Sequence, residues 1–166
     1  MRIIGVLSDT HMIKIDEAFI DLFSHGPFKE LETFIHAGDF TSVKVVEYLE
    51  RFVFYGVQGN MDDFFVKKRL PEKRVVTIDG MNIGITHGWG APFDLARRVY
   101  EYFENPALDC IVFGHSHKPT NHRIGKTLMF NPGSFKHSLI SPARTVGTLR
   151  IENGRMTGEI LKLRAP

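Results

Sequence analysis

Residues 110–119 read CIVFGHSHKP, an apolar run that closes at a glycine and is followed by two histidines, His115 and His117. Short runs rich in Ile, Val and Phe that end at glycine are typical of buried strands, whereas helices need longer amphipathic segments. The stretch therefore predicts a strand whose carboxyl end carries two imidazoles.

The same pattern occurs at four earlier places in the chain. The runs are RIIGVL before SDTH (2–11), TFIHA before GDF (33–40), RFVFYGV before QGNMD (51–62) and MNIGIT before HGW (81–89). Helical patterns lie between the early runs and after the last of them, with apolar residues sharing one face. The first set follows Asp16 in the sequence, the second follows Ser42 and the third follows Asp94. Their apolar residues are Phe19, Ile20 and Phe23, then Val45, Val46 and Leu49, and then Leu95, Val99, Tyr102 and Phe103. Asp16 and Ser42 are expected to cap their helices, because their side chains can accept from free backbone N–H groups.

The second half of the chain contains hairpin signals. VVTIDGMNIGI turns at Asp79-Gly80, and TVGTLRIENGRMTGEIL turns at Asn153-Gly154. Aspartate or asparagine before glycine favours a tight turn between antiparallel strands, whereas alternating strands and helices favour parallel βαβ units. We therefore predict an α/β fold of two packed mixed β-sheets flanked by helices, an α-β-β-α sandwich, with residues 1–166 as a single domain.

Composition narrows the class of protein. The 166 residues are 43% hydrophobic and 24% charged, with a net charge of +2. No apolar run is long enough to span a bilayer, and the N-terminal stretch does not resemble a signal peptide, so we expect a cytoplasmic protein. The single Cys110 allows no internal disulfide and is expected in the core. The basic run at 67–74 is either a solvated helix end or a rim that attracts an anionic substrate.

Side chains that bind metals gather at the five predicted strand ends. They are Asp9, His11, Asp39, Asn60, His87, His115 and His117. One such residue is usually a turn residue, but in α/β folds ligands bind beyond the carboxyl ends of the strands. Imidazole with carboxylate suits Mn²⁺, Fe, Zn²⁺ or Ni²⁺ better than Ca²⁺, and the absence of thiolates argues against a structural zinc site. Seven ligands are too many for one tetrahedral ion, so we expect two divalent ions about 3.5–4 Å apart, with Mn²⁺ preferred.

The chain resembles the calcineurin-like metallophosphoesterases in five ordered motifs: SDTH at 8–11, GD at 38–39, GN at 59–60, THG at 86–88 and GHSH at 114–117. Its small size and NPGS at 131–134 are similar to the compact bacterial and archaeal phosphodiesterase branch. The resemblance implies the two-sheet sandwich and divides the ligands: Asp9, His11 and His117 on the first ion, Asn60, His87 and His115 on the second, and Asp39 bridging. Asp39, Asn60 and His115 also count as catalytic residues.

One position departs from the family pattern. Many members have a histidine after the GN motif, and that histidine is assigned to protonation of the leaving group. This chain has Met61 at that position, and methionine carries no titratable proton.

Several other residues have more than one possible role. His36 either forms a hydrogen bond with a metal-ligand residue or is a strand histidine whose hydrogen bonds are all made within the fold. Asp62 is expected to be a turn residue or a carboxylate that supports the ligands, rather than a ligand itself. Ser134 orients a ligand or phosphate or forms a turn, and Trp89 is a wall of the site or an ordinary half-buried aromatic. His25, His122 and His137 are expected at the surface or in structural roles, the last two also as candidates to line the cleft.

These features predict an enzyme that hydrolyses a small anionic phosphodiester, with metal-bound hydroxide attacking phosphorus in line. The alternatives are a phosphomonoesterase and a non-catalytic interaction scaffold, which the retromer subunit of this fold illustrates. No Arg or Lys lies inside the five motifs, and this favours a singly charged diester over a monoester. No membrane or nucleic-acid partner is expected, and a homo-oligomer is left open.

Overall fold

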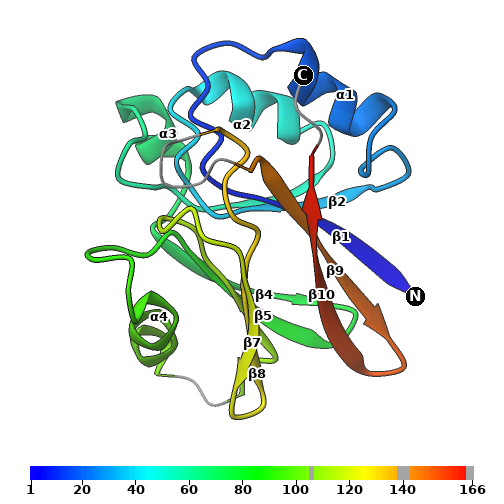
Figure 1. Cartoon of the computed structure of the whole chain (residues 1–166), viewed down its shortest axis with the longest axis vertical. Coiled ribbons are helices and arrows are strands. Elements are labelled where there is room, and N and C mark those ends of the chain that lie inside the picture. The colour runs from blue at the N-terminus through cyan, green and yellow to red at the C-terminus, as the bar shows by residue number, and fades with distance from the viewer. Residues whose placement is uncertain (105–106, 138–142, 164–166) are drawn as a thin grey trace.

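The first of two five-stranded sheets contains the first and the last strand of the described chain. The computed structural model describes residues 1–104, 107–137 and 143–163. Its first sheet has the order β10-β9-β1-β2-β3, and Figure 1 labels β1, β2, β9 and β10 of this sheet. The strands are β1 (Arg2–Leu7), β2 (Thr33–His36), β3 (Val53–Gly56), β9 (Thr145–Glu152) and β10 (Arg155–Lys162). β1, β2 and β3 run parallel, and β9 and β10 add an antiparallel hairpin beside β1.

The second sheet has the order β4-β5-β6-β8-β7. Its strands are β4 (Lys73–Ile78), β5 (Met81–Thr86), β6 (Cys110–Val112), β7 (Thr120–Ile124) and β8 (Thr127–Asn131). β5, β6 and β8 are parallel, whereas β4 and β7 pair antiparallel at the two edges. Both sheets are therefore mixed, as predicted, and both predicted hairpins are confirmed.

Four helices form among the described residues: α1 (Glu17–Ser24), α2 (Val43–Leu49), α3 (Phe64–Arg69) and α4 (Leu95–Phe103). The Asp16 carboxylate accepts from the backbone N–H of Phe19, and the Ser42 hydroxyl accepts from that of Lys44. Both predicted caps are confirmed. None of the helices in the described part of the chain is long and apolar enough to cross a membrane.

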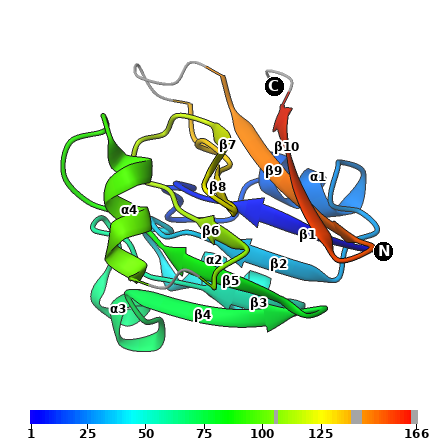
Figure 2. The ribbon, with the colours of Figure 1, turned by 90° about the horizontal axis from the view of Figure 1, so that it is seen from below.

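Three apolar clusters hold together the layers of strands and helices, and Figure 2 shows the ribbon of these layers from below. The central one lies between the sheets and includes Ile4, Ile35, Ile83 and Val112. A second, rich in phenylalanine, packs α1 and α2 on the first sheet, and the third packs α4 on the second sheet. Each sheet thus packs apolar side chains against the other sheet and against helices, and burying that surface is the main favourable term in folding. The predicted α-β-β-α sandwich is confirmed.

Local details differ from the predictions. Ile20 is 42% exposed, and Leu22 is buried in its place, because positions 19, 22 and 23 share the inner face of α1. β3 is an edge strand, so its Val53 is 52% exposed rather than buried. The β7–β8 hairpin was not predicted. Cys110 lies in the core as expected, and burial raises the pKa of its thiol.

Candidate metal centre

The loops that carry the predicted ligands lie together at one end of the two sheets. Backbone hydrogen bonds join them in pairs: Asp9 N donates to the carbonyl of Gly38, His11 N to that of Asp39, and Gly114 N to that of His87. These bonds connect loops after β1, β2, β5 and β6. The carboxyl ends of strands from both sheets therefore form one polar surface, as expected for an α/β fold.

One group of donor atoms comes from Asp9, His11 and His117. The Nε2 atom of His117 lies 3.2 Å from Asp9 Oδ1 and 3.4 Å from His11 Nε2. His11 Nε2 lies 3.8 Å from Asp9 Oδ1. Three donor atoms from two loops, those after β1 and β6, thus face a common point, with an oxygen and two nitrogens available there.

A second group comes from Asp9, Asp39 and His87, and Asn60 and His115 extend it. His87 Nε2 lies 3.3 Å from Asp39 Oδ2. The side-chain oxygen of Asn60 lies 3.1 Å from His87 Nε2 and 3.1 Å from His115 Nδ1. The structure therefore brings all seven predicted side chains into two adjoining groups.

Both carboxylates lie between these groups. Asp9 belongs to each of them, and Asp39 Oδ2 lies 3.7 Å from His11 Nε2 on the far side. The assignment of the bridge to Asp39 alone stays a prediction, because the geometry gives Asp9 an equally central place.

The donor atoms fit a cation. Asp9 Oδ1 is buried and makes no hydrogen bond of good geometry among the described residues, although His117 Nε2 lies 3.2 Å away as an ion-pair contact. A buried carboxylate oxygen without a donor is costly unless a cation neutralises it. His87 Nδ1 donates to the Ala37 carbonyl at 2.7 Å, and His115 Nε2 donates to that of Gly90 at 2.8 Å. Each ring therefore turns its other nitrogen toward the donor group, where that nitrogen offers a lone pair to a metal once it has lost its proton.

Five of the seven side chains sit on left-handed backbone: Asp9 (φ 53°), His11 (φ 44°), Asp39 (φ 59°), His115 (φ 66°) and His117 (φ 57°). This conformation is uncommon outside glycine and costs free energy, and such residues cluster at functional sites. It also re-aims the side chain, so that two histidines separated by one residue reach different donor groups.

Gly114 has a different role from the one that the turn suggested. It does not adopt a positive φ. A Cβ at this position would overlap the Ser8 hydroxyl and approach Asp9 Oδ2 to 2.9 Å. Glycine is needed at position 114 because the loop after β6 lies too close to the loop after β1 to leave room for a Cβ. The residues of this turn that adopt a positive φ are His115 and His117.

Two buried residues, Asp62 and Ser134, hold the ligand loops in place. Asp62 accepts from the backbone N–H groups of Gly59 (2.7 Å), Asp39 (3.1 Å) and Thr41 (2.7 Å), so it supports the loops and does not face the donors. Burial raises the pKa of Asp62 despite these three bonds. The Ser134 hydroxyl lies 3.0 Å from the Asp9 carbonyl oxygen and is fully buried, so it fixes the β1 loop. The interpretation of Asp62 as a supporting carboxylate is consistent with these contacts.

His36 belongs to the same scaffold. It is fully buried, stacks on Phe40, and accepts from Gly38 N at 3.2 Å. Its Nε2 pairs with the Thr10 hydroxyl at 3.1 Å. Burial and the neighbouring His87 lower the pKa of His36 well below its usual value, so the ring is a neutral support for the turn before Asp39.

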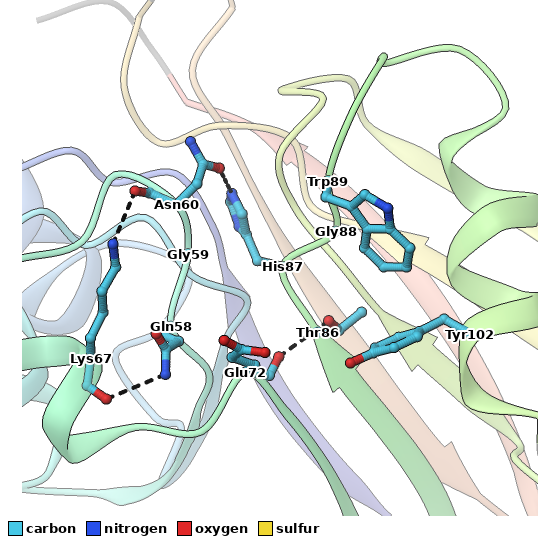
Figure 3. A pocket seen from close by; sticks show the side chains of 10 residues that line it. All are labelled: Gln58, Gly59, Asn60, Lys67, Glu72, Thr86, His87, Gly88, Trp89 and Tyr102. Carbon is cyan, nitrogen blue, oxygen red and sulfur yellow. Dashed lines mark hydrogen bonds between the residues drawn. The ribbon is translucent and has the colours of Figure 1, made fainter.

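A pocket of about 430 Å³ opens beside the second donor group (Figure 3). Asn60 and His87 belong to both the donor group and the pocket, and Trp89 lines the pocket, which is consistent with its interpretation as a wall of the site. From the basic run at 67–74, Lys67 lines the pocket, while Arg69 pairs with Glu50 at 2.6 Å.

The remaining histidines are exposed: His25 pairs with Asp21, His122 lies on edge strand β7, and His137 follows the β8 loop.

The charge of His87 links metal binding to pH. Burial disfavours the charged ring, but the hydrogen bond to Asp39 and the charges of Asp9 and Asp39 outweigh it and raise the pKa of His87 to about 9 without metal. A metal must displace that proton. We expect affinity for Zn²⁺ to rise by up to about tenfold per pH unit between pH 7 and 9. Competition titration with a chelator measures this, with His25→Asn as control. An affinity that stays constant over this range would contradict the raised pKa.

A two-sheet sandwich with this nitrogen and oxygen donor set defines the metallophosphoesterase class. The chain belongs to the calcineurin-like phosphoesterase superfamily, whose domain matches residues 1–154. A probable metallophosphoesterase of Methanothermobacter thermautotrophicus is 31% identical over 99% of this chain and 94% of its own length. A phosphodiesterase of Methanocaldococcus jannaschii is 30% identical over 78% of this chain and 82% of its own. A Vps29 from Entamoeba histolytica, solved with Zn²⁺, shares the fold with a TM-score of 0.69 and 22% identity over 96% of this chain and 98% of its own.

Proposed function

We propose that the protein is a phosphodiesterase that depends on two divalent metal ions. The supporting observation is the convergence of His11, His117, Asp39 and His87 on Asp9, whose buried Oδ1 has no hydrogen-bond partner among the described residues, with Asn60 and His115 beside His87. Asp9, His11 and His117 would hold one ion, and Asn60, His87 and His115 the other, with Asp39 shared between them. Mn²⁺ is the expected ion, and Ni²⁺, Fe and Zn²⁺ are alternatives. Bound ions would supply Lewis acidity toward the phosphoryl oxygens and an activated water.

The chain's own residues set the electrostatics of this centre. Asp9 and Asp39 are its two buried carboxylates, so two divalent ions would leave it net positive toward an anion. Asn60 Oδ1 and His115 Nδ1 meet at 3.1 Å, so both atoms would face the second ion. In the adjoining pocket Lys67 is the single basic lining residue. A site with so few fixed cations suits a diester, which carries one negative charge, better than a monoester.

The scaffold alternative predicts a protein that binds partners without turnover. The shared fold with Vps29 does not decide this, because fold alone does not fix activity. The intact donor set favours an enzyme. A cytoplasmic location and the oligomeric state stay predictions.

The direct test is hydrolysis of bis(p-nitrophenyl) phosphate and p-nitrophenyl phosphate after metal removal and after addition of Mn²⁺, Ni²⁺, Zn²⁺ or Fe²⁺. We expect metal-dependent release of nitrophenolate with a higher kcat/KM for the diester. Preferred hydrolysis of the monoester would support the phosphomonoesterase alternative. No turnover with any ion would support the scaffold.

The two histidines of the β6 loop should affect different ions. His117 faces Asp9 and His11, whereas His115 faces Asn60 and His87. His115→Ala and His117→Ala should each retain one tightly bound ion and lose the other, because each variant removes one ligand from one group only. Metal analysis after dialysis gives the stoichiometry, and His122→Ala is the control. Two variants that both keep two ions tightly would contradict the division.

A further inference from the structure

The pocket beside the second donor group has one aromatic side. Trp89, in the loop after β5, and Tyr102, on α4, form an edge-to-face pair with ring centroids 4.9 Å apart (Figure 3). Trp89 is 44% exposed and Tyr102 is 38% exposed. Exposed aromatic faces at the wall of a pocket offer a stacking surface for a planar ring.

This aromatic side is held rigidly. The Arg98 guanidinium donates to the Trp89 carbonyl at 2.6 Å and to the Phe93 carbonyl at 3.2 Å, which fixes the loop to α4. Lys73 Nζ lies 3.9 Å from the centre of the Tyr102 ring and donates to the Tyr102 carbonyl at 3.2 Å. A wall fixed before binding loses little conformational entropy when a ligand arrives.

The rest of the pocket is polar. Lys67 and Gln58 lie opposite the aromatic side, with Thr86 and Glu72 between them (Figure 3). Lys67 Nζ donates to the Asn60 carbonyl at 3.3 Å, and Gln58 donates to the Leu70 carbonyl at 2.7 Å, so both are positioned. Among the described residues, no hydrogen bond or ion pair engages the Glu72 carboxylate, which is free to accept N–H groups from a ligand.

We propose that this pocket, the aromatic subsite, binds the nucleobase of a nucleotide-derived phosphodiester whose phosphate lies at the metal centre. The inference rests on the proposed function for the phosphate position. A planar ring would stack on one of the two aromatic rings, Trp89 or Tyr102, and meet the other at its edge, and its own N–H edge would face Glu72. The volume of about 430 Å³ lies within the range of about 300–1,000 Å³ found for small-molecule sites. A diester with only small alkyl arms would leave this surface uncovered.

Trp89 is the only tryptophan of the chain, so its fluorescence reports this pocket without turnover. The matched probes are adenosine monophosphate and ribose 5-phosphate, which share a phosphate and a pentose and differ in the base. With excitation at the red edge of tryptophan absorption and Zn²⁺ present, we expect saturable quenching and at least about tenfold tighter binding of the nucleotide, the scale of base stacking on an aromatic side chain.

Tyr102→Ala should weaken nucleotide binding about tenfold and leave ribose 5-phosphate much less affected. Phe93→Ala is the control, because Phe93 is 74% exposed in the same loop but does not line the pocket. Equal affinities for the two probes, or equal weakening of both by Tyr102→Ala, would overturn the subsite. Nucleotide binding without hydrolysis of any diester would overturn the proposed activity and leave the subsite standing.

Discussion

Replacing Asp39 with asparagine is expected to remove most turnover while the fold survives. The substitution removes a negative charge that lies 3.3 Å from His87 and 3.7 Å from His11, between the two donor groups. An amide binds a divalent ion much less strongly than a carboxylate does. Because loss of one electrostatic contact to a transition state costs about 10²–10³-fold, we expect kcat to fall by at least that factor.

The local structure around position 39 should persist in this variant. Asp39 Oδ1 accepts from Met61 N at 2.8 Å, and an amide oxygen can accept the same bond. Circular dichroism and thermal melting would check the fold, and Asp79→Asn, in the β4–β5 turn, is a matched control for loss of one carboxylate. Full activity of Asp39→Asn with added metal would show that Asp39 is not the bridge, and Asp9→Asn would then be the variant to measure.

The second large effect concerns the leaving group. Met61 follows Asn60, is 60% exposed, and cannot donate a proton. Nitrophenolate leaves as a stable anion, but an alkoxide needs a proton or a cation, and losing a general acid typically costs about 10²–10⁴-fold. We therefore expect efficient hydrolysis of aryl phosphodiesters and slow hydrolysis of simple dialkyl phosphates.

Met61→His should narrow this gap by accelerating the poorer substrates most. The measurement is kcat/KM against leaving-group pKa for a series of phosphodiesters in both forms. Phe64→His is the control, because it adds an exposed histidine nearby that is not adjacent to Asn60. A flat dependence in the native protein would mean that another residue supplies the proton. His36 cannot do so, since it is buried and engaged with Thr10 and Gly38, so Lys67 and Tyr102 in the pocket would be tested first.

Much of the fold follows from local signals. The apolar runs that become β1, β2, β5 and β6, the caps Asp16 and Ser42, and the Asp79-Gly80 turn depend on neighbours within a few residues. Turn chemistry and hydrophobic periodicity are therefore readable from the chain itself. The β7–β8 hairpin carried a weaker signal, a Gly-Lys turn at 125–126 without a preceding Asp or Asn.

Exposure was harder to predict where it depends on sheet order. The run 51–57 has the composition of a buried strand, but β3 became an edge because only β2 pairs with it among the described strands. No local pattern encodes which strand of a sheet lies at the edge. The same limit applies to Gly114, whose need for a missing Cβ arises from Ser8, more than one hundred positions earlier in the chain.

By itself the sequence determined the kinds of side chain at the strand ends and their order, because five short motifs fix residue types and place them after strands. Tertiary structure alone decided how they meet. It set the left-handed backbone at Asp9 and His115, which aims their side chains at shared points. It also brought Trp89 against Tyr102 and placed both beside Asn60 and His87. The physical reason is that a metal centre and a pocket are made of contacts between distant segments, and these exist only once the two sheets pack.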